Sequence, residues 1–231
     1  MILNRNKKLE VNYTSMDKIF HPDNPVMRFL TWFCNMMYIN ILFILTSIPI
    51  ITIGASLSGM YTCCMKLIRG EESYIWKDFF KAFKENFKQA TLLWLVALIL
   101  CGIWFGNLYI LFHMLGGNMV YLQIPIWILL FITFSILQYA FPLLSQYENS
   151  TKQLVKNAIL LAIANFPTTL MLLVIHLIPV FYCAFSLENV IRAASVLCFF
   201  GFALIAFVSS FFINHILKKL EDDKDEAFSQ K

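Results

Sequence analysis

Four long stretches without a charged side chain constrain this sequence more than any other feature. No Asp, Glu, Lys or Arg occurs in residues 29–65, 89–147, 157–187 and 193–217. A helix that crosses the hydrocarbon core of a bilayer, about 30 Å thick, needs about 20 apolar residues. The chain is 59% hydrophobic and 14% charged, whereas ordinary soluble domains have about 45–50% apolar and about 25% charged residues. The sequence therefore predicts an all-α, polytopic membrane helix bundle in a lipid bilayer.

The lengths of these stretches predict about six transmembrane helices in a single domain. The first stretch is too long for one straight span and holds two, of which the second is short. The second stretch divides at HMLGGNMVY, where paired glycines and an asparagine favour a turn. The remaining two supply one span each, with SLENVIR between them. The predicted spans are residues 29–49, 53–68, 90–113, 121–144, 158–185 and 193–217, between a tail of residues 1–28 and a charged tail of residues 218–231.

The sequence SIPIITIGAS indicates a bend, so that the first two spans form a hairpin. Pro49 lacks a backbone donor, and Gly54 tolerates backbone conformations that other residues resist. Lys and Arg near span ends accumulate on the cytoplasmic side of a membrane. A hairpin with its turn at the outer face leaves Arg192 as the only one of 18 Lys and Arg residues outside. We therefore expect both termini in the cytoplasm. Because residues 53–68 are few, a helix that re-enters without crossing fully stays open.

Small side chains in the return arm of this hairpin are candidates for close helix packing. They include two pairs at positions i and i+4, a spacing that lets neighbouring helices approach closely in lipid. The predicted packing residues are Gly54, Ala55, Ser58 and Gly59.

Residues 74–89, YIWKDFFKAFKENFKQ, have the pattern of an interfacial amphipathic helix. Aromatic residues recur three and four positions apart, and lysines repeat about once a turn along another face. This combination suits the boundary between acyl chains and anionic headgroups. We expect a docking surface for lipid or a partner, with aromatic packing beneath the bundle as an equal alternative. The candidate docking residues are Trp76, Lys77, Phe80, Lys81, Phe83, Lys84, Phe87 and Lys88.

Several polar side chains within the predicted spans are candidates either for a ligand site or for hydrogen bonds between helices. His176 is notable because Pro167, ahead of it, must bend or break its helix. A kinked helix with freed carbonyls can line a cavity. Interhelical hydrogen bonding is the simpler explanation for each residue. The five candidates are Asn35, Asn40, Gln138, Asn165 and His176.

Common catalytic and nucleotide-binding motifs are missing from the sequence. It contains no GxxxxGK[ST], HExxH, GxSxG or CxxC pattern. All six cysteines lie in predicted spans, where a thiol behaves as a small apolar group. The span interiors carry no charged side chain, which weighs against proton- or sodium-coupled pumping. We expect no enzymatic activity, no cofactor, no metal site and no nucleic-acid partner.

Three motifs in the first hundred residues carry a family resemblance: the SIPIITIGAS bend, the RGEESY turn and the FFKAFKENFKQA run. Through these motifs the sequence resembles the YesL family, while the later spans match only in hydrophobic pattern. The resemblance implies a multi-pass protein of the bacterial cytoplasmic membrane, encoded beside carbohydrate uptake transporters and two-component sensors. It implies no catalytic residues, because the family has no established activity.

The resemblance favours an accessory role in carbohydrate uptake by an ABC transporter, or in its sensing. The expected partners are transporter subunits or a sensor kinase. An ABC permease itself would carry a cytoplasmic Glu-Ala-Ala loop, which is absent here. The alternative function is a small-molecule-binding membrane subunit, similar in length and span number to the substrate-binding components of energy-coupling-factor transporters. The sequence does not decide whether the chain forms homo-oligomers.

Overall fold

The computed structural model describes residues 24–71, 74–113 and 120–229. Every regular element in these ranges is a helix, which confirms the predicted all-α class. Most of the predicted N-terminal tail lies outside the described residues. The elements are α2 (Pro25–Thr46), the 3-10 turn η1 (Ile50–Thr52), α3 (Ile53–Arg69), α4 (Ile75–Glu85), α5 (Phe87–His113), α6 (Val120–Gln146), α7 (Thr151–Ala164), α8 (Phe166–Ala184), α9 (Leu187–Val196), the π-helical stretch η2 (Leu197–Gly201) and α10 (Phe202–Ser229).

Six helical segments within the described ranges are long and apolar enough to cross a membrane, as predicted. This number indicates a multi-pass membrane protein. The segments are Pro25–Thr46, Ile50–Arg69, Phe87–His113, Gln123–Gln146, Phe166–Ala184 and Leu187–Asp222.

The first two segments form the predicted hairpin. α2 ends at Thr46, three residues before Pro49, because a residue that precedes proline is disfavoured in helical conformation. The Thr52 hydroxyl donates to the Thr46 carbonyl oxygen at 2.6 Å and closes the turn. We refer to residues 47–52 as the hairpin tip.

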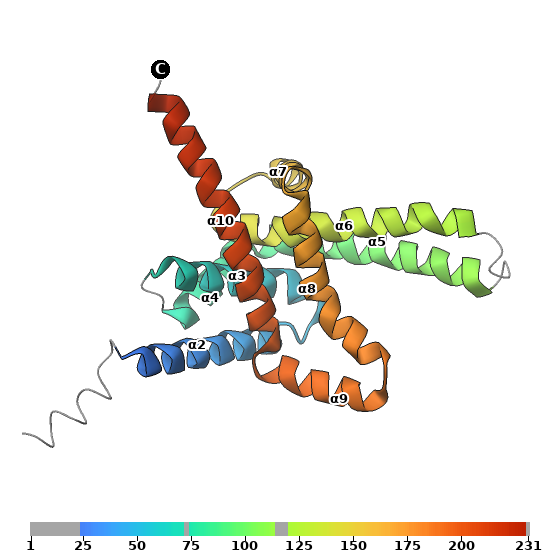
Figure 1. The fold of residues 1–231 in the computed structure, drawn as a ribbon, viewed down its shortest axis with the longest axis horizontal. Coiled ribbons are helices and arrows are strands. Elements are labelled where there is room, and N and C mark those ends of the chain that lie inside the picture. The colour runs from blue at the N-terminus through green and yellow to red at the C-terminus, as the bar shows by residue number, and fades with distance from the viewer. Residues whose placement is uncertain (1–23, 72–73, 114–119, 230–231) are drawn as a thin grey trace, which may run out of the picture.

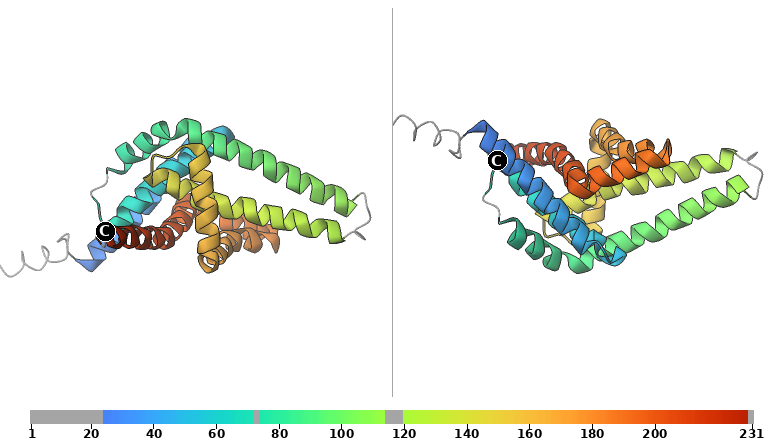
Figure 2. Two further views of the ribbon diagram at one scale, coloured as in Figure 1. Left: turned by 90° about the horizontal axis from the view of Figure 1, so that it is seen from above. Right: turned by 90° about the horizontal axis from the view of Figure 1, so that it is seen from below.

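The predicted span of residues 158–185 is two helices, because the chain breaks at Asn165. This residue has φ −116° and ψ 47°, which is not helical. Pro167 lies in the first turn of α8, where its missing N–H leaves no helical bond unmade. α7 begins earlier, at Thr151, and runs across α6 (Figure 2). The last predicted span likewise begins within α9 and passes through η2 into α10.

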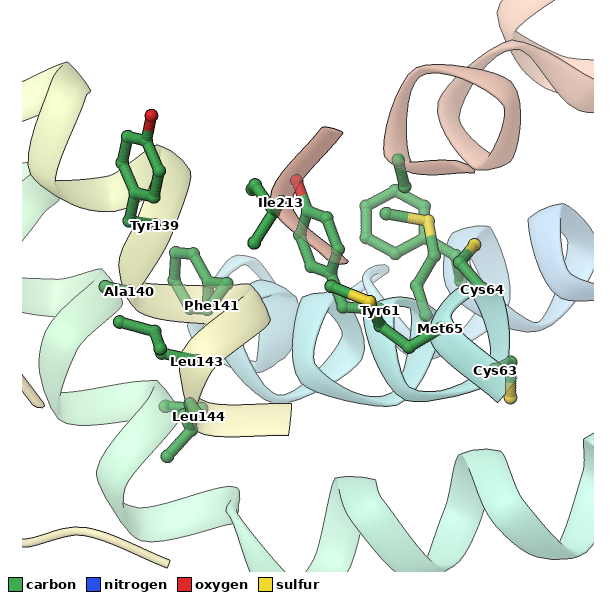
Figure 3. Packing of buried hydrophobic residues seen from close by; sticks show 14 of the residues in the cluster. Tyr61, Cys63, Cys64, Met65, Tyr139, Ala140, Phe141, Leu143, Leu144 and Ile213 are labelled. Carbon is green, nitrogen blue, oxygen red and sulfur yellow. The ribbon is translucent and has the colours of Figure 1, made fainter. Parts of the chain in front are cut away.

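α3 is the central helix of the fold. It contacts α2, α4, α5, α6 and α10, and ten of its residues are buried. Figure 3 shows Tyr61 of α3 beside Ile213 of α10, with Phe141 of α6 in the same cluster. Small residues along α3 allow several helices to approach it closely.

The helices do not share one direction. α5 and α6 lie side by side and project as a long hairpin away from the other helices (Figure 1). The group formed by α2, α3 and α4 lies at the base of this hairpin and runs in a different direction (Figure 2). α8 and α10 cross the α5–α6 direction steeply (Figure 1). Length and apolarity therefore do not by themselves decide which segments cross the bilayer together.

Candidate functional site

The predicted interfacial helix of residues 74–89 is shorter in the structure, because α4 ends at Glu85 and residues 87–89 belong to α5. α4 is anchored to α3 through its aromatic side. The Phe79 ring is fully buried, and a Cβ atom added at Gly59 would lie 3.2 Å from it. One turn earlier on α4, the Ile75 carbonyl oxygen accepts a weak hydrogen bond from the Cys63 thiol at 3.6 Å. Higher residue numbers on α3 thus pair with lower numbers on α4. The two helices are antiparallel.

The same register continues through the bend between α4 and α5. Asn86 ends α4, and its side-chain amide donates to the Ser58 hydroxyl oxygen at 2.9 Å. A Cβ atom at Gly54 would overlap the Ala90 carbonyl oxygen and lie 2.7 Å from the Trp94 Cβ. Only glycine fits there. Of the predicted packing residues, Gly54, Ser58 and Gly59 thus face the segment that contains α4 and the start of α5, and Ala55 is fully buried.

The aromatic docking candidates form a row along α4 that continues to Phe87, the first residue of α5. Ring centroids are 4.5 Å apart for Trp76 and Phe80, 6.3 Å for Phe80 and Phe83, and 5.6 Å for Phe83 and Phe87. Phe80 and Phe83 are half-buried beside Phe79. Trp76 is 56% exposed and Phe87 is 37% exposed. The middle of the row packs against the bundle, and its ends reach the surface.

The lysine candidates form an exposed basic face, which we call the lysine row: Lys77, Lys81, Lys84 and Lys88. Lys77 Nζ lies 5.2 Å from the centroid of the Tyr74 ring, in cation–π geometry. The ion pair that holds α4 to α3 uses other residues, Lys66 and Asp78, at 2.8 Å. In the described part of the chain, no acidic side chain pairs with the lysine row. Its charges are available to a partner from outside.

Asn40 holds the π-helical stretch. The side chain is fully buried, and its Nδ2 donates to the carbonyl oxygens of Leu197, at 3.0 Å, and Cys198, at 2.7 Å. Its Oδ1 accepts from the Ala203 N–H at 3.0 Å. A π-helical turn departs from the usual i to i−4 pairing of backbone groups. Interhelical hydrogen bonding therefore accounts for Asn40 fully.

Two other polar candidates bond to their own stretch of backbone. His176 Nδ1 lies 2.8 Å from the Leu172 carbonyl oxygen, and its ring meets Phe134 edge-on at 5.6 Å. The Asn165 side-chain amide donates to the Leu161 carbonyl oxygen at 3.2 Å. Asn35 is half-buried on α2. The described contacts do not bring these residues together around one centre.

Gln138 differs from the other polar candidates. It is only 5% exposed, and neither Oε1 nor Nε2 has a hydrogen-bond partner among the described residues. The next residue, Tyr139, bonds to Thr169 through their hydroxyl groups at 3.0 Å and joins α6 to α8. A buried amide without partners costs roughly 1–3 kcal/mol. Gln138 is therefore the one of the five polar candidates whose buried amide atoms both lack a partner among the described residues.

A cavity of about 560 Å³ lies between α6, α7 and α8. Its polar lining consists of the Ser135 and Thr169 hydroxyl groups. Ser135 donates to the Phe131 carbonyl oxygen at 2.8 Å, and Thr169 to that of Ala162 at 2.9 Å. A sugar needs several free polar groups around it, whereas this lining suits an apolar chain.

A polar cluster that the sequence patterns did not reveal joins α3, α10 and the α6–α7 connection. Arg69 Nε donates to Asn214 Oδ1 at 3.0 Å, and the Tyr147 hydroxyl donates to Glu221 Oε1 at 2.6 Å. Burial, and then the Glu221 carboxylate, raise the pKa of Tyr147 to about 12. The phenol is therefore protonated at neutral pH and remains a donor. No group of three or more His, Cys, Asp or Glu side chains in the described ranges could hold a metal ion.

Comparisons with known proteins give similarity but no activity. A family model described as "Protein of unknown function, DUF624" matches residues 36–108. These residues include most of the α2–α3 hairpin, all of α4 and most of α5. Uncharacterized protein YteU of Bacillus subtilis (strain 168) is 25% identical over 207 residues, which cover 87% of this chain and 89% of that protein. No solved structure matches. The matched family region contains the α3–α4 contact and the lysine row.

Proposed function

We propose that this chain is an accessory integral membrane protein without catalytic activity, which associates with an ABC-type carbohydrate uptake system or with its sensor. The resemblance to the YesL family supports this biological setting and the bacterial cytoplasmic membrane. The lysine row supplies the means of association, through an acidic surface on a transporter or sensor subunit at the cytoplasmic face.

The observation that carries the proposal is that one side of α4 packs against α3, while the lysines on its other side are exposed and can contact a partner. Phe79 and the Lys66–Asp78 ion pair hold the helix against α3. From Lys77 to Lys84 the lysine row extends about 10 Å along α4. A charged surface on a rigid helix loses less conformational entropy on binding than a mobile segment does. Complementary charge also accelerates association and selects the partner.

Matched charge variants test this role. The four residues of the lysine row are replaced by Gln, and a control replaces Lys152, Lys156, Lys218 and Lys219, which are equally exposed. Each variant loses four positive charges. The transporter or sensor subunits encoded beside the gene should copurify in gentle detergent with the wild type and the control. The lysine-row variant should lose them at normal folded yield. Equal recovery with both variants contradicts the proposal.

The cavity between α6, α7 and α8 supports the alternative function, a small-molecule-binding subunit. Its lining favours an apolar compound over a sugar. The purified protein should then carry an apolar small molecule detectable by native mass spectrometry, and Ala162→Trp should fill the cavity and displace it. A wild-type protein that carries no such molecule argues against this alternative.

A further inference from the structure

We propose that the α2–α3 hairpin does not cross the bilayer. In this arrangement it lies at the membrane face that carries the lysine row, and its tip dips into the hydrocarbon of that leaflet. The α5–α6 hairpin crosses the bilayer. This inference concerns contacts with lipid and does not depend on the proposed partner.

The segment that follows α3 runs back along it in a fixed register. Phe79 lies at Gly59, and Ala90 lies at Gly54, next to the first residue of α3. By residue 90 the chain has therefore returned along α3 to the hairpin tip. Trp94 marks this level, because its Nε1 donates to the Ile50 carbonyl oxygen at 2.9 Å.

α5 extends far beyond the hairpin tip. Residues 95–113 continue past Trp94, and at 1.5 Å per residue they extend for about 28 Å, close to the thickness of the hydrocarbon core. Their surface is apolar, with Ile99, Phe105 and Ile110 among the exposed side chains. α6 accompanies α5 along this length, as Figure 2 shows. This projecting hairpin has the length and the surface of a membrane-crossing pair.

One bilayer does not accommodate both hairpins as crossing pairs. The α2–α3 hairpin lies at the base of the α5–α6 hairpin, not beside it (Figure 2). If α2 and α3 crossed the bilayer, the part of α5 and α6 that extends beyond the hairpin tip would lie in water with its apolar side chains exposed. The lysine row, which lies alongside α3, would then be in hydrocarbon, where charged side chains are unfavourable. Both problems disappear when α5 and α6 cross.

The hairpin tip carries exposed apolar side chains. Ile48 is 73% exposed and Ile50 is 65% exposed, with Leu45 and Ile51 exposed beside them. A turn that emerged at the outer face would place these side chains in water. At the base of a membrane-crossing hairpin they contact acyl chains. A hairpin that dips into the bilayer returns the chain to the side from which it came, as a hairpin that crosses twice also does. α4 is therefore expected on the cytoplasmic side in both arrangements.

The test introduces one accessible cysteine at a time into the full chain after reconstitution. The exposed or half-buried Cys34, Cys101, Cys183 and Cys198 are replaced by Ala, and the buried Cys63 and Cys64 are retained. A spin label at Ile50→Cys should collide several-fold more with oxygen than with a water-soluble nickel chelate. A label at Lys88→Cys should show the reverse preference.

Membrane-impermeant maleimide provides the second measurement. In cells and inverted vesicles, Lys88→Cys and Tyr121→Cys should react from opposite sides of the membrane. Preferential nickel access at position 50 overturns the inference, because the tip is then in water. Reaction of positions 88 and 121 from the same side also overturns it, because α5 and α6 then do not cross.

Discussion

Replacement of Asn40 by Leu should destabilise the protein strongly, although the two side chains have the same number of heavy atoms and the same branching. The substitution removes the amide that binds Leu197, Cys198 and Ala203. Two carbonyl groups of the π-helical stretch and the N–H group of Ala203, in the first turn of α10, then lose a partner within a buried contact. Each hydrogen bond contributes about 0.5–1.5 kcal/mol net, so we predict a loss of roughly 3 kcal/mol. For a chain of this size that corresponds to a fall of about 6–12 °C in Tm.

The assay is thermal unfolding in mild detergent, followed by tryptophan fluorescence. Asn35→Leu is the matched control, because Asn35 lies on the same helix and is only half-buried. The control should change Tm by less than about 2 °C. Equal Tm values for the two variants would refute the argument, since they would show that the Asn40 amide does not hold η2.

Three further substitutions test the packing and the polar cluster. Gly59→Leu should lower the free energy of unfolding by about 1–3 kcal/mol, because the new side chain displaces the buried Phe79 ring. Gly102→Leu is the control, since nothing lies within 4 Å of a Cβ atom added there, and it should cost less than about 0.5 kcal/mol. Equal Tm values for the two variants contradict the close contact between Gly59 and Phe79. Gln138→Leu should preserve or raise Tm, because both amide atoms are buried without partners; a clear fall in Tm would reveal a bond made by that amide. The Tyr147 pKa rises from 10.0 to about 12 on folding, so its contribution to stability is complete below pH 10 and disappears as pH rises through 12. Tyr147→Phe, which cannot ionise beside Glu221, should reduce this loss in alkaline unfolding scans, and an unchanged pH dependence counts against the hydrogen bond.

Local patterns in the sequence predicted the elements of this fold well. Pro49 predicted the hairpin bend, and Pro167 predicted a bend or break in the fifth predicted span. The spacing of Phe79, Phe83 and the lysines predicted an amphipathic helix. Each of these features depends on residues within about four positions of one another, so a single sequence is sufficient to recognise it.

Contacts between distant segments could not be predicted in this way. Gly59 signals a close approach, but nothing in its neighbourhood indicates that Phe79 is the partner. Asn40 bonds to residues 157 and 158 positions away, in a stretch whose sequence does not signal a π-helical turn. The hydrophobicity of a segment also predicts that it contacts lipid, but it does not predict how deeply the segment lies in the bilayer. The relation between the two hairpins therefore emerges only from the register of α3 with α4 and α5.

The central claim is that α4 is anchored by its aromatic side and binds a partner through the lysine row. Photo-crosslinking in living cells tests it most directly, with p-benzoylphenylalanine placed at Lys81 on the exposed face and at Phe79 on the buried face. We predict a crosslink from position 81 to a transporter or sensor subunit encoded beside the gene. This product should disappear when Lys77, Lys84 and Lys88 are replaced by Gln, and position 79 should crosslink only within the chain. A partner crosslink from position 79, or only lipid adducts from position 81, would contradict the claim.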